Sequence, residues 1–166
     1  MTTFDELIGP LLDREGGFVD HKSDRGGATN HGITQRVFTD WQSARAKPYR
    51  DVRSLTRAEA AEIYRALYWN AARCDDLPES VRDIHFDSAV NHGVRRAAIL
   101  LQGAAGATQD GAIGEKTMHA VHAMDGGLLR MRYIALRYRF YGAIIHRDRS
   151  QLVFIAGWMA RMAEFD

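Results

Sequence analysis

Residues 14–34 read REGGFVDHKSDRGGATNHGIT, and this stretch decides how the first part of the chain folds. Its glycine pairs, Gly16-Gly17 and Gly26-Gly27, are strong turn signals. We therefore expect a helix to end near Arg14 and a turn-rich loop to follow it. Phe18 and Val19, inside this loop, favour a short hairpin.

The loop carries two carboxylates and a hydroxyl within a short span. Glu15 comes at the expected helix end, Asp24 follows it in the loop, and Thr29 comes soon after. Two carboxyl groups that face each other across a cleft suit the cleavage of a glycosidic bond. One protonates the leaving oxygen, and the other handles a water molecule or the sugar carbon. The same residues also fit a plain capping turn, so the pattern alone leaves both interpretations open.

Helical patterns dominate the rest of the chain. The sequences Thr3-x-x-Glu6 and Thr56-x-x-Glu59 are capping boxes, which open helices. Pro10 should kink the first helix or end it early, because proline lacks the N–H that a helix needs. Apolar spacing and turn residues predict a mainly all-α protein, with helices over residues 3–14, 34–46, 56–72, 79–91, 94–105, 115–124 and 127–146, and a last one capped by Ser150.

Composition excludes several classes of protein. Lys and Arg number 22 and Asp and Glu 21 in 166 residues, so the net charge of +1 argues against a nucleic-acid binder. Cys74 is the only cysteine, which excludes an intramolecular disulfide. No apolar run approaches the roughly 18 residues of a membrane helix, and the first residues carry no signal-peptide pattern.

The loop sequence closely resembles the opening motif of glycoside hydrolase family 108, the bacterial and phage peptidoglycan muramidases. The matching residues are Glu15-Gly-Gly-Phe and Asp24-x-Gly-Gly-x-Thr29-Asn30-x-Gly-Ile-Thr34. Phe18 stands where this family more usually has tyrosine. The resemblance continues in order along the chain in Ile63-Tyr64-x-x-x-Tyr68-Trp69, Phe86-Asp87-x-x-x-Asn91-x-Gly93, Leu101-Gln102, Asp110-Gly111-x-Ile113-Gly114-x-x-Thr117 and Gly157-Trp158-x-x-Arg161.

This resemblance implies a lysozyme-like helical fold with a small hairpin or loop after the first helix. It implies an enzyme that cleaves the β-1,4 bond between N-acetylmuramic acid and N-acetylglucosamine, without a cofactor. Glu15 would be the general acid, and Asp24 and Thr29 would hold the attacking water, giving inversion. Residues placed at the substrate by the same resemblance are Asn30, Tyr68, Asn91 and Gln102.

We expect one domain over residues 1–166, because the connecting loops are short. Residues 1–93 would form its catalytic half. Residues 94–166 would form a helical half, in which Asp110–Thr117 looks like the peptidoglycan-binding motif of the family.

Two other functions stay open. The seven histidines invite a zinc-dependent wall amidase or peptidase, but His119 and His122 lack a His-Glu-x-x-His pattern and a third ligand, so we predict no metal. Cys74 precedes two aspartates and is expected to be a structural thiol. A non-catalytic peptidoglycan-binding module would fit the Asp110–Thr117 motif, although the set of Glu15, Asp24 and Thr29 argues against it.

The arginines near the C-terminal end raise a question of charge. Residues 126–166 hold seven arginines against Asp148, Glu164 and Asp166, a net charge of +4. On the expected helix, the pair Arg130 and Arg137 lies about 200° away from the pair Arg132 and Arg139. This favours a solvated face, or attraction to the anionic cell wall, over a membrane-active helix.

The biological role implied by the resemblance is that of a phage or prophage endolysin. The enzyme would be a monomer whose partner is bacterial peptidoglycan. Without a signal peptide, it would stay in the cytoplasm until a holin releases it to the wall.

Overall fold

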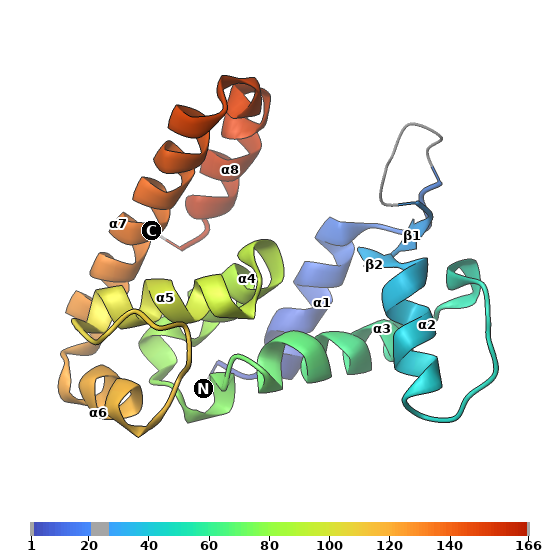
Figure 1. The fold of residues 1–166 in the computed structure, drawn as a ribbon, viewed down its shortest axis with the longest axis horizontal. Coiled ribbons are helices and arrows are strands. Elements are labelled where there is room, and N and C mark those ends of the chain that lie inside the picture. Colours follow the sequence, from blue (N-terminus) through green and yellow to red (C-terminus); the bar gives the residue numbers. More distant parts are fainter. Residues whose placement is uncertain (1, 21–26, 166) are drawn as a thin grey trace. The chain divides into compact units, whose positions relative to one another are not determined.

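A computed structural model describes residues 2–20 and 27–165, and in them the chain is mainly α-helical with one small antiparallel hairpin (Figure 1). This confirms the predicted fold class. The chain divides into two compact units, residues 2–67 and residues 68–165. In the described residues, no helix is long and apolar enough to cross a membrane. The number of domains stays a prediction, and each unit is considered by itself below.

In residues 2–20 and 27–67, the N-terminal unit has three α-helices and the hairpin. Both capping boxes are confirmed, since Thr3 and Thr56 each exchange hydrogen bonds with the glutamate three residues later. Its elements are α1 (Phe4–Glu15), β1 (Thr29–Asn30), β2 (Ile33–Thr34), α2 (Gln35–Ser43), the 3₁₀ turn η1 (Val52–Ser54) and α3 (Arg57–Tyr64).

Helix α1 runs through Pro10 as far as Glu15, close to the predicted end at Arg14, so of the two effects expected of Pro10 the early end is wrong. The apolar face of the helix explains this, because its side chains are buried on both sides of the proline. Tertiary packing thus outweighs the lost backbone hydrogen bond. The buried residues of α1 are Phe4, Ile8, Leu11 and Leu12.

The hairpin lies later in the loop than predicted. Its strands pair Thr29 with Thr34 and Asn30 with Ile33. Val19 adds only an isolated bridge, in which its N–H and carbonyl pair with those of Thr29 at 2.8 and 2.9 Å. Thr34 ends the hairpin and caps α2, since its hydroxyl accepts from the N–H of Val37.

The helix predicted over residues 56–72 changes character partway. α3 ends at Tyr64, and a π-helix (η2) follows over Arg65–Asn70. A π-helix bonds residue i to i+5, so side chains five apart share a face. Accordingly Tyr64 and Trp69 are both buried, whereas Tyr68 is partly exposed.

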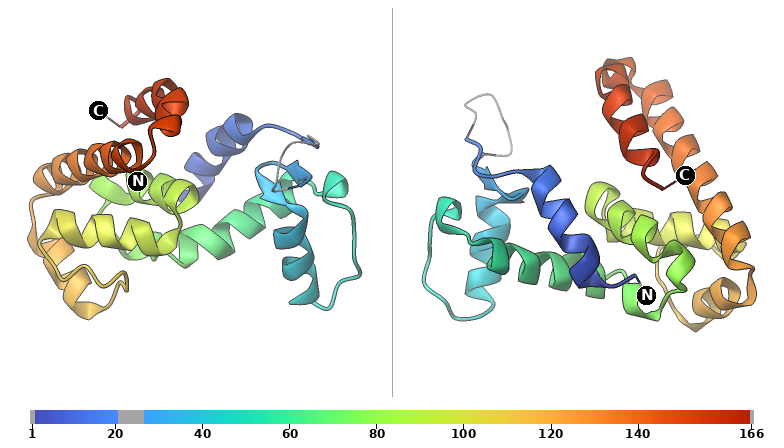
Figure 2. Two further views of the ribbon diagram at one scale, coloured as in Figure 1. Left: turned by 45° about the horizontal axis from the view of Figure 1, so that its top comes forward. Right: turned by 180° about the vertical axis from the view of Figure 1, so that it is seen from behind.

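The C-terminal unit packs α4, α5 and α7 around one apolar core, and α7 and α8 lie side by side (Figure 1, Figure 2). Asp148, not Ser150, caps the last helical segment, because its carboxylate accepts from the Ser150 N–H. The elements are η3 (Cys74–Asp76), α4 (Glu79–His92), α5 (Val94–Ala105), α6 (Glu115–Ala123), α7 (Gly126–Arg147), η4 (Arg149–Phe154) and α8 (Ile155–Met162).

Helix α7 carries its arginines on two sides, as predicted, but the expectation of a solvated face is wrong for Arg137, which is buried. Arg130 turns toward α4 and ion-pairs with Asp83 at 2.7 Å. Arg137 is fully buried and ion-pairs with Asp87, which also lies in α4. Arg161 of α8 approaches the other oxygen of Asp87 at 3.2 Å. One buried carboxylate therefore joins three helices.

Candidate active site

Glu15 is the last residue of α1 and is partly buried. The helix stops there because Gly16 adopts a φ of +76°, which side-chain-bearing residues rarely adopt. The N–H of Gly16 donates to the carbonyl of Leu12 at 3.2 Å and closes the last turn. Glu15 thus stands at the end of a helix whose apolar face is buried in the core.

The hairpin turn is built from His31 and Gly32, which connect the paired residues Asn30 and Ile33. Both turn residues have positive φ, +50° and +74°. Positive φ at both positions is what a type I′ turn requires, and this turn matches the twist of a two-residue hairpin. Residues 30–32, read Asn-His-Gly, therefore shape a tight turn.

This turn lies directly against Glu15. A β-carbon placed on Gly32 would stand 2.7 Å from Oε2 of Glu15 and 2.6 Å from the hydroxyl oxygen of Tyr64. The Tyr64 hydroxyl donates to the carbonyl of His31 at 3.1 Å. The end of α1, the hairpin turn and the end of α3 thus converge, and only glycine fits between the two oxygens.

Tyr64 is the residue of this site that sequence reasoning missed. Tyr64 is only 2% exposed. Its hydroxyl nevertheless ends at the turn beside Glu15. The available signal was a phenol within an otherwise apolar helix face, since a buried hydroxyl needs a partner.

The two other predicted catalytic residues are Thr29 and Asp24. Thr29 is a partly buried residue of β1, and its backbone is paired with Val19 on one side and with Thr34 on the other. Asp24 lies outside the residues that the structure describes. The catalytic assignment of all three residues stays a prediction.

Asn30 was predicted to contact substrate, but the structure gives its side chain an internal partner set. It is 6% exposed, and its amide nitrogen donates to the carbonyls of Val52 and Leu55 at 3.1 and 3.2 Å. These bonds fasten the η1 turn to the hairpin. Asn30 therefore supports the hairpin through these bonds, and its contact with substrate stays a prediction.

Gln102, in the C-terminal unit, also proves structural. It is fully buried, and its amide nitrogen donates to Oδ1 of Asp110 at 2.7 Å and to the hydroxyl of Thr117 at 3.1 Å. Its oxygen accepts from the Gly111 N–H at 2.9 Å. The N–H of Ala112 and the amide of Gln102 hold the pKa of Asp110 below its usual value. The Asp110–Thr117 motif is therefore organised around Gln102, and a substrate contact by Gln102 stays a prediction.

Tyr68 and Asn91 belong to the same C-terminal unit. Tyr68 is partly exposed in the π-helix. Asn91 is exposed in the last turn of α4, where its amide donates to the Asp87 carbonyl at 2.8 Å and its oxygen accepts from Arg161. The side-chain amide of Asn91 thus has partners within the C-terminal unit. Substrate contacts by these two residues stay predictions.

The histidines and Cys74 were considered above for metal or thiol chemistry. Among residues 2–20 and 27–165, no three His, Cys, Asp or Glu side chains are grouped to hold a metal ion. His85 is fully buried between the Tyr133 hydroxyl and the Ala72 carbonyl, and burial lowers its pKa to about 4. Cys74 is buried, and burial raises the pKa of its thiol, which confirms a structural thiol.

The mainly helical fold, with a glutamate at a helix end against a small hairpin, is the arrangement that the resemblance to a glycoside hydrolase implies. The family model described as glycosyl hydrolase 108 matches residues 8–93, and the chain belongs to this family. A second model, described as a predicted peptidoglycan domain, matches residues 96–163. The protein is therefore a peptidoglycan hydrolase.

The solved structures provide a similar protein. The structure of Brucella abortus SagA is 34% identical in sequence, with a TM-score of 0.81, and the match covers 98% of this chain and 90% of that one. A search of curated proteins finds no match.

Proposed function

We propose that the chain is an N-acetylmuramidase that cleaves the β-1,4 bond between N-acetylmuramic acid and N-acetylglucosamine, with Glu15 as the general acid. The observation that carries this proposal is the position of the Glu15 carboxylate, fixed at the end of α1 against the turn at Gly32. Gly32 itself is exposed, so the turn offers a surface without side chains beside the carboxylate. A sugar ring can approach such a backbone closely.

In the proposed mechanism, Glu15 donates its proton to the glycosidic oxygen as the bond to the anomeric carbon breaks. Asp24 and Thr29 hold a water molecule on the opposite face of the sugar, and Asp24 accepts a proton as the water attacks. The product then has an inverted anomeric configuration. Tyr64 is a positioning residue that holds the turn in place through its hydrogen bond to His31.

Mass spectrometry of the muropeptides released from purified peptidoglycan tests this proposal. The wild type should release fragments with reducing-end muramic acid, and Glu15→Gln should release none while keeping its circular dichroism and melting temperature. Free stem peptides in place of reducing ends would make the protein an amidase. Near-wild-type release by Glu15→Gln would remove Glu15 from the mechanism.

The stereochemical part needs its own measurement. Proton NMR of the first product, recorded before mutarotation, should show the inverted anomer. A retained anomer would contradict the water-holding role and make Asp24 the nucleophile.

We also propose that the enzyme serves as an endolysin of a phage or prophage, held as a monomer in the cytoplasm until a holin releases it. Support comes from the resemblance to family members with this role. Expression in a bacterial host with and without a holin tests it, because lysis should require the holin. Lysis without a holin would contradict the proposal.

A further inference from the structure

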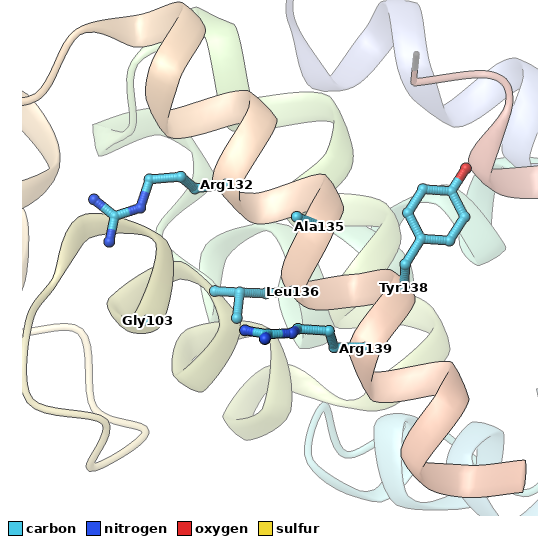
Figure 3. A pocket seen from close by; sticks show the side chains of 6 residues that line it. All are labelled: Gly103, Arg132, Ala135, Leu136, Tyr138 and Arg139. Carbon is cyan, nitrogen blue, oxygen red and sulfur yellow. The ribbon is translucent and has the colours of Figure 1, made fainter.

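Helix α7 forms one wall of a pocket of about 460 Å³ in the C-terminal unit (Figure 3). The side chains of Arg132, Leu136 and Arg139 project to the same side of the helix, toward Gly103 of α5. The lining residues are Gly103, Arg132, Ala135, Leu136, Tyr138 and Arg139.

The two arginines of this pocket differ from the other two on the same helix. Arg130 and Arg137 are neutralised by Asp83 and Asp87. Within the described part of the chain, Arg132 and Arg139 form no ion pair, and both are exposed. Helix α7 thus has an inner pair that maintains the fold and an outer pair whose charge is available to a ligand.

The surface between the outer arginines is mainly apolar. A β-carbon on Gly103 would stand 3.1 Å from Cδ1 of Leu136, so α5 and α7 approach closely there. Leu136 lies on the same side as the two guanidinium groups, and Ala135 adds further hydrocarbon to the lining. The pocket therefore suits a ligand with two negative groups joined by an apolar segment.

The spacing defines the ligand further. Residues seven apart lie about 10 Å apart along a helix axis, which is about the length of three residues of an extended peptide. Guanidinium forks pair with carboxylates. All six lining residues lie in the segment matched as a predicted peptidoglycan domain.

We propose that this pocket binds two carboxylates of the acidic stem peptide of peptidoglycan, with the methyl groups of its alanines over Leu136. The proposal rests on the proposed function in that it takes the bacterial wall as the substrate. It adds a peptide-recognition site to an enzyme that cuts glycan.

Binding of a synthetic tetrapeptide stem to the full chain, measured by calorimetry, tests this. Arg132→Ala/Arg139→Ala should weaken binding by at least about tenfold, since each charged hydrogen bond contributes about that factor. Arg147→Ala/Arg149→Ala removes the same charge from exposed positions outside the pocket and should leave affinity unchanged. A stem peptide with amidated carboxylates should bind the wild type no more tightly than the acidic peptide binds Arg132→Ala/Arg139→Ala.

Equal losses in both double variants, or equal binding of the amidated peptide, would overturn the proposal. Because the peptide has no glycosidic bond, its binding is measured independently of hydrolysis. Release of reducing-end muramic acid from glycan strands stripped of stems should be the same for wild type and Arg132→Ala/Arg139→Ala. Failure of the muramidase proposal would instead appear as absence of that product with both proteins.

Discussion

The Glu15 carboxylate and the backbone of Gly32 are in such close contact that position 32 has no room for a β-carbon. We expect Gly32→Ala to push Glu15 and the Tyr64 hydroxyl away from the turn. The left-handed backbone adds a cost of about 1–2 kcal/mol. Activity should fall about a hundredfold, because misplacement of a catalytic group by about 1 Å has that effect. Turbidity assays and thermal unfolding provide the measurements.

Gly142→Ala is the matched control for this variant. Gly142 lies within α7, has no positive φ, and has open space where a β-carbon would stand. Its replacement should raise stability slightly and leave the rate unchanged. A wild-type rate for Gly32→Ala would show that the turn does not position Glu15.

Tyr64→Phe removes the hydrogen bond to the His31 carbonyl and leaves that acceptor without this partner. We expect the free energy of unfolding to fall by about 1–2 kcal/mol. If Tyr64 positions the turn during catalysis, kcat should fall about tenfold with little change in KM. Tyr49→Phe, at a side chain 68% exposed, should change neither quantity. An unchanged kcat with lowered stability would show that Tyr64 stabilises the fold but does not position the turn for catalysis.

Asp87→Asn should strongly destabilise the C-terminal unit. The carboxylate is 5% exposed, and it faces the buried guanidinium of Arg137 and that of Arg161. Removing its charge leaves the Arg137 charge buried without compensation, at a cost of about 3–5 kcal/mol. Urea unfolding is the measurement. Asp76→Asn, which affects an exposed pair with Arg73, should cost less than about 1 kcal/mol. Similar losses of unfolding free energy for the two variants would show that the buried ion pairs of Asp87 contribute no more than an exposed pair.

Stability of the C-terminal unit should fall on acidification. Burial, assisted by Arg137 and Arg161, lowers the pKa of His92 to about 3, and burial lowers that of His85 to about 4. The unfolded chain takes up protons near pH 6.5, where the folded state keeps both rings neutral. The free energy of unfolding should therefore decrease from pH 6.5 toward about 3, by up to about 1.4 kcal/mol per pH unit for each histidine.

His92→Gln should reduce this dependence by about one proton. Urea titrations between pH 7 and pH 4, followed by the fluorescence of Trp69 and Trp158, measure the slope. A slope equal to that of the wild type would show that His92 takes up no extra proton on unfolding.

Local signals in the sequence predicted the fold well. Thr3 and Thr56 each act on a residue three positions away, so their capping boxes can be identified without tertiary information. The failures arose where distant packing decides the outcome. Helix α1 continues through Pro10 because its face is buried, and the π-helix after Tyr64 changes a periodicity that the sequence pattern cannot reveal.

The site was predicted less completely, for a related reason. Asn30 and Gln102 are polar residues within motifs, and such residues can face either a ligand or the backbone. Asn30 bonds carbonyls more than 20 positions away, and Gln102 bonds a loop about ten positions away. The sequence pattern does not reveal these internal bonds, and contact of either residue with a sugar stays a prediction.

The ion pairs of α7 also change how the protein should respond to ionic strength. Residues 126–166 have a net charge of +4, but Arg130 and Arg137 are matched by acids of α4, outside that segment. Dissolved salt screens exposed charges far more than buried ones. Raising the salt concentration should therefore weaken long-range attraction between this surface and an anionic wall, while the buried pair within the unit persists. At high salt concentration we therefore expect binding to the wall to weaken while the C-terminal unit remains folded.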